Sequence, residues 1–341
     1  MTNNTVSAYN FEAAKAEYRA FCEAGNHDIQ VFALPWYLDA VCDNPDDWRV
    51  ILYKEGNKVV AAFPFSYTKN KSGWWTIQNP WQSKRLGFWI DYSGKTQGHK
   101  KEAFENEVVQ FVIDNLPLFD VFHIDFDARF TNWRVFYNNG FSQQTSYSYV
   151  VRKEQMEGDY YSTIAKHKKK DIKTLQSLLV IDEIDNFDDY WSFFEKSYEL
   201  RGRTSSYTRD QAERLITAAQ GHGAIKIYAA KNQEGQITGV SVIFFDSRRS
   251  YCMFGTFDPT IKISPRVLLT YQSILDMTGK GLDYDFEGSM IPGVAQYDME
   301  FNPEREPYFN ITKQSDRVKL KTSFIQLTSL LKKKILGKQN S

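Results

Sequence analysis

Asp285-Phe286-Glu287, near the end of the chain, repeats the pattern of Asp125-Phe126-Asp127 at a separation of 160 residues. The same separation relates four aromatic residues, namely Phe141 and Phe301, and Tyr149 and Phe309. A repeat of this length predicts two copies of one small α/β domain, with a candidate site where the copies meet.

The segments upstream of the two copies also match. Residues 48–80 and residues 225–259 both read as three strands, joined first by a turn with glycine and then by a polar turn. A helix and a further strand follow each of them. We therefore predict two α/β domains, residues 1–152 and 153–317, each a mixed, mostly antiparallel sheet flanked by helices.

Composition narrows the class of protein. The chain has 341 residues, of which 42% are hydrophobic and 16% aromatic, enough for two sizeable cores. Its net charge of zero argues against a broad nucleic-acid-binding surface but leaves room for a local basic groove. No metal motif, secretory leader or membrane-spanning run is visible. These features predict a soluble, cytoplasmic protein without a metal.

Several segments resemble one family. Residues 281–290, GLDYDFEGSM, and residues 307–311, PYFNI, resemble a stretch of the tandem-GNAT family of Fem-type aminoacyl ligases and bacterial N-acyltransferases described as methicillin-resistance-like. Three more segments fit: the basic run 166–170, the segment 201–208 (RGRTSSYT), and the strand end 255–259 (GTFDP). The resemblance covers most of residues 30–313 and implies two tandem GNAT-like domains.

The resemblance also implies a chemistry. Fem-type ligases join an amine of a cell-wall precursor to the ester carbonyl of an aminoacyl-tRNA, and other relatives use an acyl thioester. Direct attack of this kind needs a base, a donor to the oxyanion and a positioned leaving group. The implied function is an N-acyltransferase or aminoacyltransferase that forms an amide on a cell-envelope precursor or glycan. Its donor would be acyl-CoA or aminoacyl-tRNA.

Two segments depart from the family pattern. Thioester-using relatives carry a glycine-rich loop before the main helix, whereas residues 261–266 read IKISPR and include Pro265, which has no N–H. Lys262 and Arg266 would compensate by charge, beside Gly255 at the strand end. Residues 297–300 are acidic where ligases tend to be basic. The missing glycine motivates an alternative function, a catalytically silent module that binds a phosphate-bearing ligand.

Glu287 is the candidate general base, and strand alternation places Asp285 on the same face. The two carboxylates would face a cationic amine. Alternatively, they are salt-bridge partners of a neighbouring arginine, and the sequence leaves both readings open. In the first copy, Asp125 and Asp127 are expected to be structural or to belong to an acceptor cleft.

Candidate substrate-binding residues lie in three segments. Arg201 and Arg203 would grip a phosphate or carboxylate, with Tyr207 beside them, or would form a solvated helix end. Lys168 would line a groove for the phosphates of a precursor, tRNA or coenzyme A, or belong to a solvated face. Trp81 and Trp89 lie in a loop and would line a sugar or precursor cleft.

The end of the chain is a basic amphipathic segment, residues 318–336. A helix here would pack on the first domain. The alternative is peripheral contact with an anionic membrane, where a lipid-linked precursor would be found.

Overall fold

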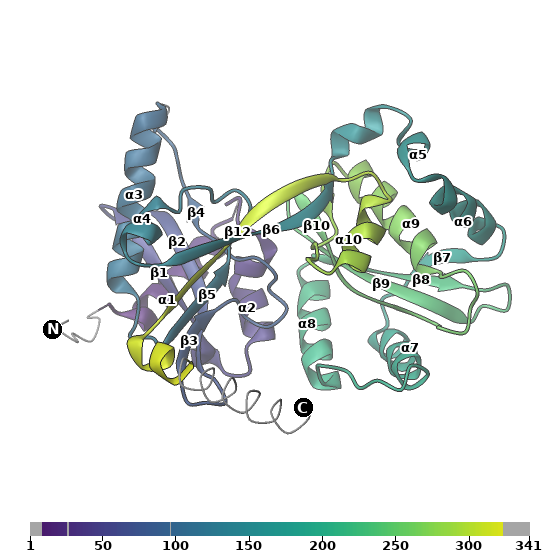
Figure 1. The fold of residues 1–341 in the computed structure, drawn as a ribbon, viewed down its shortest axis with the longest axis horizontal. Coiled ribbons are helices and arrows are strands. Elements are labelled where there is room, and N and C mark those ends of the chain that lie inside the picture. The colour runs from purple at the N-terminus through teal and green to yellow at the C-terminus, as the bar shows by residue number, and fades with distance from the viewer. Residues whose placement is uncertain (1–8, 26, 96, 323–341) are drawn as a thin grey trace, which may run out of the picture.

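The computed structural model describes residues 9–25, 27–95 and 97–322, and they form one mixed, mostly antiparallel sheet flanked by helices (Figure 1). The strand order is β1-β2-β3-β5-β12-β6-β11-β10-β9-β8-β7, and β4 pairs with β2 off this path. The predicted α/β class, a mixed and mostly antiparallel sheet flanked by helices, is therefore confirmed, although the strands form one sheet and not a separate sheet in each half. The strands are β1 Trp48–Glu55, β2 Lys58–Lys69, β3 Trp75–Gln78, β4 Trp89–Ile90, β5 Val121–Asp125, β6 Ser142–Val151, β7 Val180–Glu183, β8 Ile225–Lys231, β9 Ile237–Phe245, β10 Arg249–Phe257, β11 Asp283–Asp285 and β12 Glu304–Gln314.

Helices cover both faces of the sheet. The α-helices are α1 Phe11–Glu23, α2 Pro35–Val41, α3 Gly98–Asn115, α4 Arg134–Asn138, α5 Tyr160–Thr163, α6 Lys166–Gln176, α7 Phe187–Glu199, α8 Arg209–Gly221, α9 Arg266–Gly279 and α10 Pro292–Met299. In the second half, alternate residues of β9 enter different cores: Ile243 packs with α6 and α9, and Val242 packs with α7 and α8. The core that contains Val242 also includes residues of α1 and α2, so this core joins the two halves of the chain.

The two halves exchange their closing strands. β6, from the first half, pairs with β11 of the second, and β12, from the second half, pairs with β5 of the first. β6 and β12 also pair with each other, and Figure 1 shows them side by side between the halves. The exchange makes one continuous sheet out of two half-sheets.

The register of this exchange obeys the sequence repeat. Asp125 is opposite Asn310, and the residues 160 positions away from these two, Asp285 and Val150, are also opposite each other. Tyr147 is opposite Pro307, which is its own counterpart at the same separation. The pairing is therefore symmetric about the Tyr147–Pro307 pair.

The halves differ where the parallel strands separate. In the first half, β3 and β5 pair as far as Gln78 and His123, and residues 79–90 then fill the gap beyond them. Leu86 bridges Phe126, and β4 returns to pair with β2. In the second half, β10 and β11 pair only as far as Tyr251 and Asp285, whereas β10 continues along β9 to Phe257. Among the described strands, none fills this second gap.

Pro265 is the N-cap of α9, and the Ser264 hydroxyl makes no capping bond. Most of the 318–336 segment lies outside the described residues. Its start, residues 316–322, is helical, and Arg317 pairs with Asp120 of the first half. The described residues include no helix that is long and apolar enough to cross a membrane.

Strand exchange predicts that a residue of β12 stabilises the first half. Ile311 is fully buried in the core formed by β2, β5 and α3. Ile311→Ala should lower the free energy of unfolding by about 2–5 kcal/mol in urea denaturation, because it leaves a cavity there. Leu320→Ala, at a position 73% exposed, is the control and should change it by less than about 0.5 kcal/mol. Equal effects of the two substitutions would contradict the exchange.

Candidate functional site

The gap between β10 and β11 is accompanied by a bulge in β10. Cys252 is opposite Ile243 and Phe254 is opposite Val242, so Met253 is an extra residue without a direct partner on β9. A bulge turns one backbone amide out of the ladder, and such irregularities are frequent beside active sites. The bulge at Met253 therefore lies two residues beyond Tyr251, where the pairing of β10 with β11 ends.

A buried group of charges lies at the end of β11. Asp285 is the last residue of the strand and Glu287 follows two positions later. Both carboxylates accept hydrogen bonds from Nη2 of Arg85, at 2.5 Å to Asp285 and 2.9 Å to Glu287. Arg85, Asp285 and Glu287 are 1%, 0% and 6% exposed. The two carboxylates are therefore salt-bridge partners of an arginine, the alternative reading of the sequence, and this arginine comes from the first half.

Asp285 has several further partners. Arg249 donates to its Oδ2 at 3.0 Å, and Ser148 of β6 donates to its Oδ1 at 2.5 Å. The backbone N–H of Glu287 donates to the same Oδ1 at 2.8 Å. These contacts hold the Asp285 carboxylate in one position at the centre of the site.

Glu287 differs from Asp285 in having a free oxygen. Its Oε2 is buried and has no hydrogen-bond partner among the described residues. Burial raises the pKa of Glu287 to about 7; the Arg85 charge opposes this shift and the Asp285 charge adds to it. A carboxyl group with a pKa near neutrality can accept and release a proton under physiological conditions.

The backbone at Glu287 is strained. Its φ of 62° lies in the left-handed region, which is uncommon for residues other than glycine, and Gly288 follows with a φ of 53°. A Cβ at Gly288 would overlap the carbonyl oxygen of Tyr147 and lie 2.6 Å from Cα of Ser148. Glycine is required here because the segment passes directly against β6. Strain of this kind often accompanies functional residues.

The Arg201 segment holds the far end of β10. Arg201 donates to Oγ1 of Thr256 at 2.8 Å and to the carbonyl oxygen of Phe257 at 2.5 Å. Arg203 is exposed, and its guanidinium forms no hydrogen bond or ion pair with the other described residues. Tyr207 packs against Trp81, with ring centroids 5.5 Å apart. Trp81 and Tyr207 therefore join the halves as part of the core rather than lining an open cleft.

A second buried group lies around Tyr297 of α10. Lys168 is 7% exposed, and its Nζ is 3.1 Å from Oε2 of Glu300 and 3.8 Å from the Tyr297 ring centroid. The Arg266 guanidinium also lies 3.8 Å from that centroid. Two positively charged side chains, Lys168 of α6 and Arg266 of α9, thus lie against the acidic segment 297–300. The solvated-face reading of Lys168 is wrong, because its side chain is turned inward.

Asp298 belongs to the same group. Burial raises its pKa to about 7, although Arg266 stands 3.9 Å away. Gly255 lies near the end of β10, and Lys262 is exposed in the loop that joins β10 to α9. Together with Arg266, the first residue of α9, they border one loop. The predicted donor-binding residues therefore lie at the two ends of this loop and within it, and the Arg266 side chain points toward Asp298.

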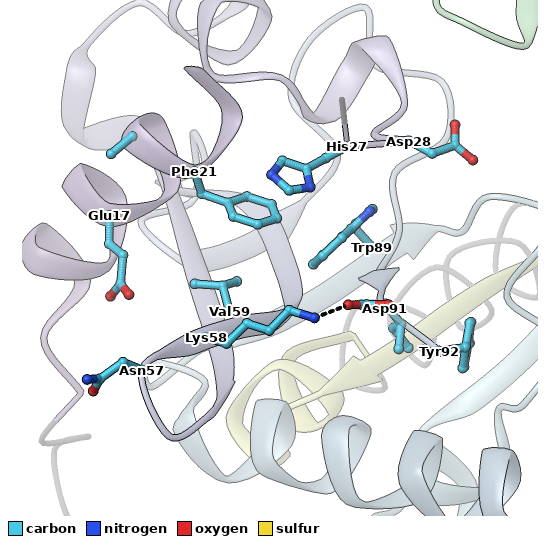
Figure 2. Close-up of a pocket in the computed structure, with 12 residues that line it drawn as sticks. Glu17, Phe21, His27, Asp28, Asn57, Lys58, Val59, Trp89, Asp91 and Tyr92 are labelled. Atoms are coloured by element: carbon cyan, nitrogen blue, oxygen red, sulfur yellow. Dashed lines mark hydrogen bonds and ion pairs between the residues drawn. The ribbon is translucent and has the colours of Figure 1, made fainter. Parts of the chain in front are cut away.

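Trp89 lines a cavity of about 700 Å³ in the first half (Figure 2). Phe21 and His27 stack there with ring centroids 3.6 Å apart, and Trp89 meets the Phe21 ring edge-on at 4.8 Å. Figure 2 shows Lys58 and Asp91 paired at the rim of the cavity.

The carboxylates of the first copy have partners of their own. Asp127 pairs with Arg129 at 2.5 Å, and Asp125 lies 3.3 Å from His123.

Arg85 is the residue that sequence reasoning missed. It stands in an irregular loop with no motif around it. The only signal was indirect: two carboxylates at one buried strand end require a cation, but the sequence does not say which one.

Comparisons with known proteins agree with this architecture. Residues 163–298 match the family model described as an acetyltransferase (GNAT) domain, and no curated protein matches the chain. The crystal structure of FemX is similar with a TM-score of 0.63 and 10% identity, covering 86% of this chain and 95% of that one.

Two further structures come from proteins named for lysylphosphatidylglycerol synthesis. The C-terminal domain of the protein from Agrobacterium fabrum gives a TM-score of 0.56 at 8% identity, over 93% of this chain and 96% of that one. L-PGS from Bacillus licheniformis gives 0.52 at 9% identity, over 89% and 94%. Residues 163–298 are thus similar to a GNAT acetyltransferase domain, and the chain as a whole has a fold similar to that of FemX.

Proposed function

We propose that the protein is an N-acyltransferase or aminoacyltransferase that forms an amide on an amine of a cell-envelope precursor or glycan. The observation that carries the proposal is the free Oε2 of Glu287, a buried carboxylate oxygen at the open end of β11. The names of the similar structures support an aminoacyl or acyl donor and an envelope acceptor.

Glu287 would act as the base. The neutral acceptor amine attacks the carbonyl carbon of the donor, and the ionised Glu287 takes a proton from the nitrogen as the C–N bond forms. The C–O or C–S bond of the donor then breaks, and the proton held by Glu287 passes to the departing hydroxyl or thiol group. The bulged amide at Met253 would donate a hydrogen bond to the oxyanion. The exposed residues Met290 and Ile291, just beyond Glu287, mark the side from which an acceptor would approach.

The reaction is assigned to the second half because no described strand lies between β10 and β11 beyond Tyr251 and Asp285. The corresponding gap in the first half is occupied by residues 79–90. Asp127, the repeat counterpart of Glu287, is already paired with Arg129, which helps to lower its pKa against the effect of burial. We propose that residues 153–317 form the catalytic domain and that residues 1–152 shape the acceptor side.

The donor would lie along the loop between β10 and α9. Lys262 and Arg266 are cations there, and Gly255 of β10 is exposed. Pro265 provides no N–H at the start of the helix, so side-chain charge would have to replace part of the usual amide cradle. Both an acyl thioester and an aminoacyl ester are compatible with this arrangement.

Glu287→Gln should lower turnover by roughly 10²–10⁴-fold, because the amide cannot accept the proton. Turnover is measured as thiol release from acetyl-CoA and longer acyl-CoAs, or as deacylation of charged tRNA, with an amine acceptor. The wild-type rate should rise as the pH increases through about 7, since the base must be ionised. Glu234→Gln, in an exposed turn, is the matched control. Unchanged turnover in Glu287→Gln would remove the base assignment, and a failure of every donor to shift the melting temperature would favour the silent binding module.

Gly288→Ala tests the placement of the carboxylate. The new methyl group would overlap β6 and would occupy a left-handed backbone conformation, at a cost of roughly 2–5 kcal/mol in unfolding free energy. Gly293→Ala, in α10, has nothing within 4 Å of its Cβ and should be nearly neutral. Equal stability of the two variants in thermal denaturation would show that the segment does not pass against β6 as described.

A further inference from the structure

Arg85 stands on a segment that the first half holds firmly. The N–H of Leu86 donates to the carbonyl oxygen of Asp125 at 2.8 Å, and the N–H of Asp127 donates to that of Leu86 at 3.0 Å. The Tyr37 hydroxyl donates to the carbonyl oxygen of Gln82 at 2.8 Å. These bonds fix the backbone on both sides of Arg85. Its guanidinium is therefore presented to the second half from a rigid support.

The two carboxylates depend on Arg85 to different degrees. Asp285 keeps Arg249, Ser148 and the Glu287 N–H as partners if Arg85 is removed. The side chain of Glu287 has Arg85 as its one hydrogen-bond partner in the described residues, through Oε1. Arg85 thus holds one oxygen of Glu287 and leaves the other free.

We propose that Arg85 is a positioning residue for the base, so that the reaction centre is shared by both halves of the chain. The inference rests on the proposed function in that Glu287 is taken to be the base. Independently of that function, Arg85, which lies 202 positions away in the sequence, orients the Glu287 carboxylate and sets its charge. The first half would then be required for proton transfer as well as for shaping the acceptor side.

The charges around Glu287 make the consequence predictable. The titratable and charged groups that face it come from five elements: Arg85 and Lys84 of the 79–90 segment, Asp285 of β11, Arg249 of β10, Tyr37 of α2 and Tyr308 of β12. Without Arg85, two carboxylates would share a buried space with less positive charge. Asp285 retains Arg249, so Glu287 would take up the proton.

The opposite change follows from removing the neighbouring carboxylate. Asp285→Asn deletes a like charge and leaves Arg85 to pair with Glu287 alone. The pKa of Glu287 should then fall, whereas Arg85→Met should raise it. A purely structural disturbance would not shift the pKa in opposite directions in the two variants.

The experiment is a pH titration by difference infrared spectroscopy, which follows the C=O stretch of protonated carboxyl groups and needs no ligand. The Glu287 signal is assigned by its loss in Glu287→Gln, which separates it from Asp298. Arg85→Met should move the midpoint upward by about one to three pH units, and Asp285→Asn should move it downward. Arg85→Lys, which keeps the charge, should give a smaller upward shift and serves as the conservative variant if Arg85→Met does not fold.

Arg152→Met is the matched control. Arg152 pairs with Asp283, Glu304 and Glu306 on the neighbouring strands and does not contact Glu287. This variant should be destabilised while the Glu287 midpoint stays in place. A wild-type midpoint in both Arg85 variants would overturn the inference, whatever the activity. Full turnover in Glu287→Gln would instead overturn the proposed function and leave the titration result standing.

Discussion

The pairing of β6 with β12 is the constraint on which the rest of the structure depends. Each strand closes the half-sheet of the other half, so neither half has a complete sheet without its partner. An unpaired strand edge is a liability in water, and the exchange removes two such edges. It also brings Ser148 of β6 to Asp285 and seats Gly288 against Tyr147. The candidate site is thus built by the joining of the halves.

Unequal use of the two gaps follows from the same duplication. Both halves have parallel strands that separate, but the first half fills its gap with residues 79–90. That filling segment carries Arg85 into the second half, where burying a lone cation would be costly without the two carboxylates. The first half, in which residues 79–90 fill the gap, thus contributes Arg85 to the carboxylates of the second half.

The sequence predicted what depends on local pattern. The repeat was visible from spacing, and strand alternation predicted that Asp285 and Glu287 lie together. Strand exchange was not visible, because a strand's pattern does not say which strand lies beside it. Arg85 was missed for the same reason, since its role exists only through tertiary contact. Trp81 and Tyr207 read as open-site residues but pack together across the halves.

We propose that the donor binds in the second half, where β10 and β11 separate. Hydrogen exchange measured with and without coenzyme A, and with and without a non-hydrolysable aminoacyl-nucleotide analogue, tests this placement. One of these probes should slow exchange at residues 252–266 and 286–290 and leave residues 76–79 and 121–127 unchanged. Protection confined to the first-half strand ends would contradict it.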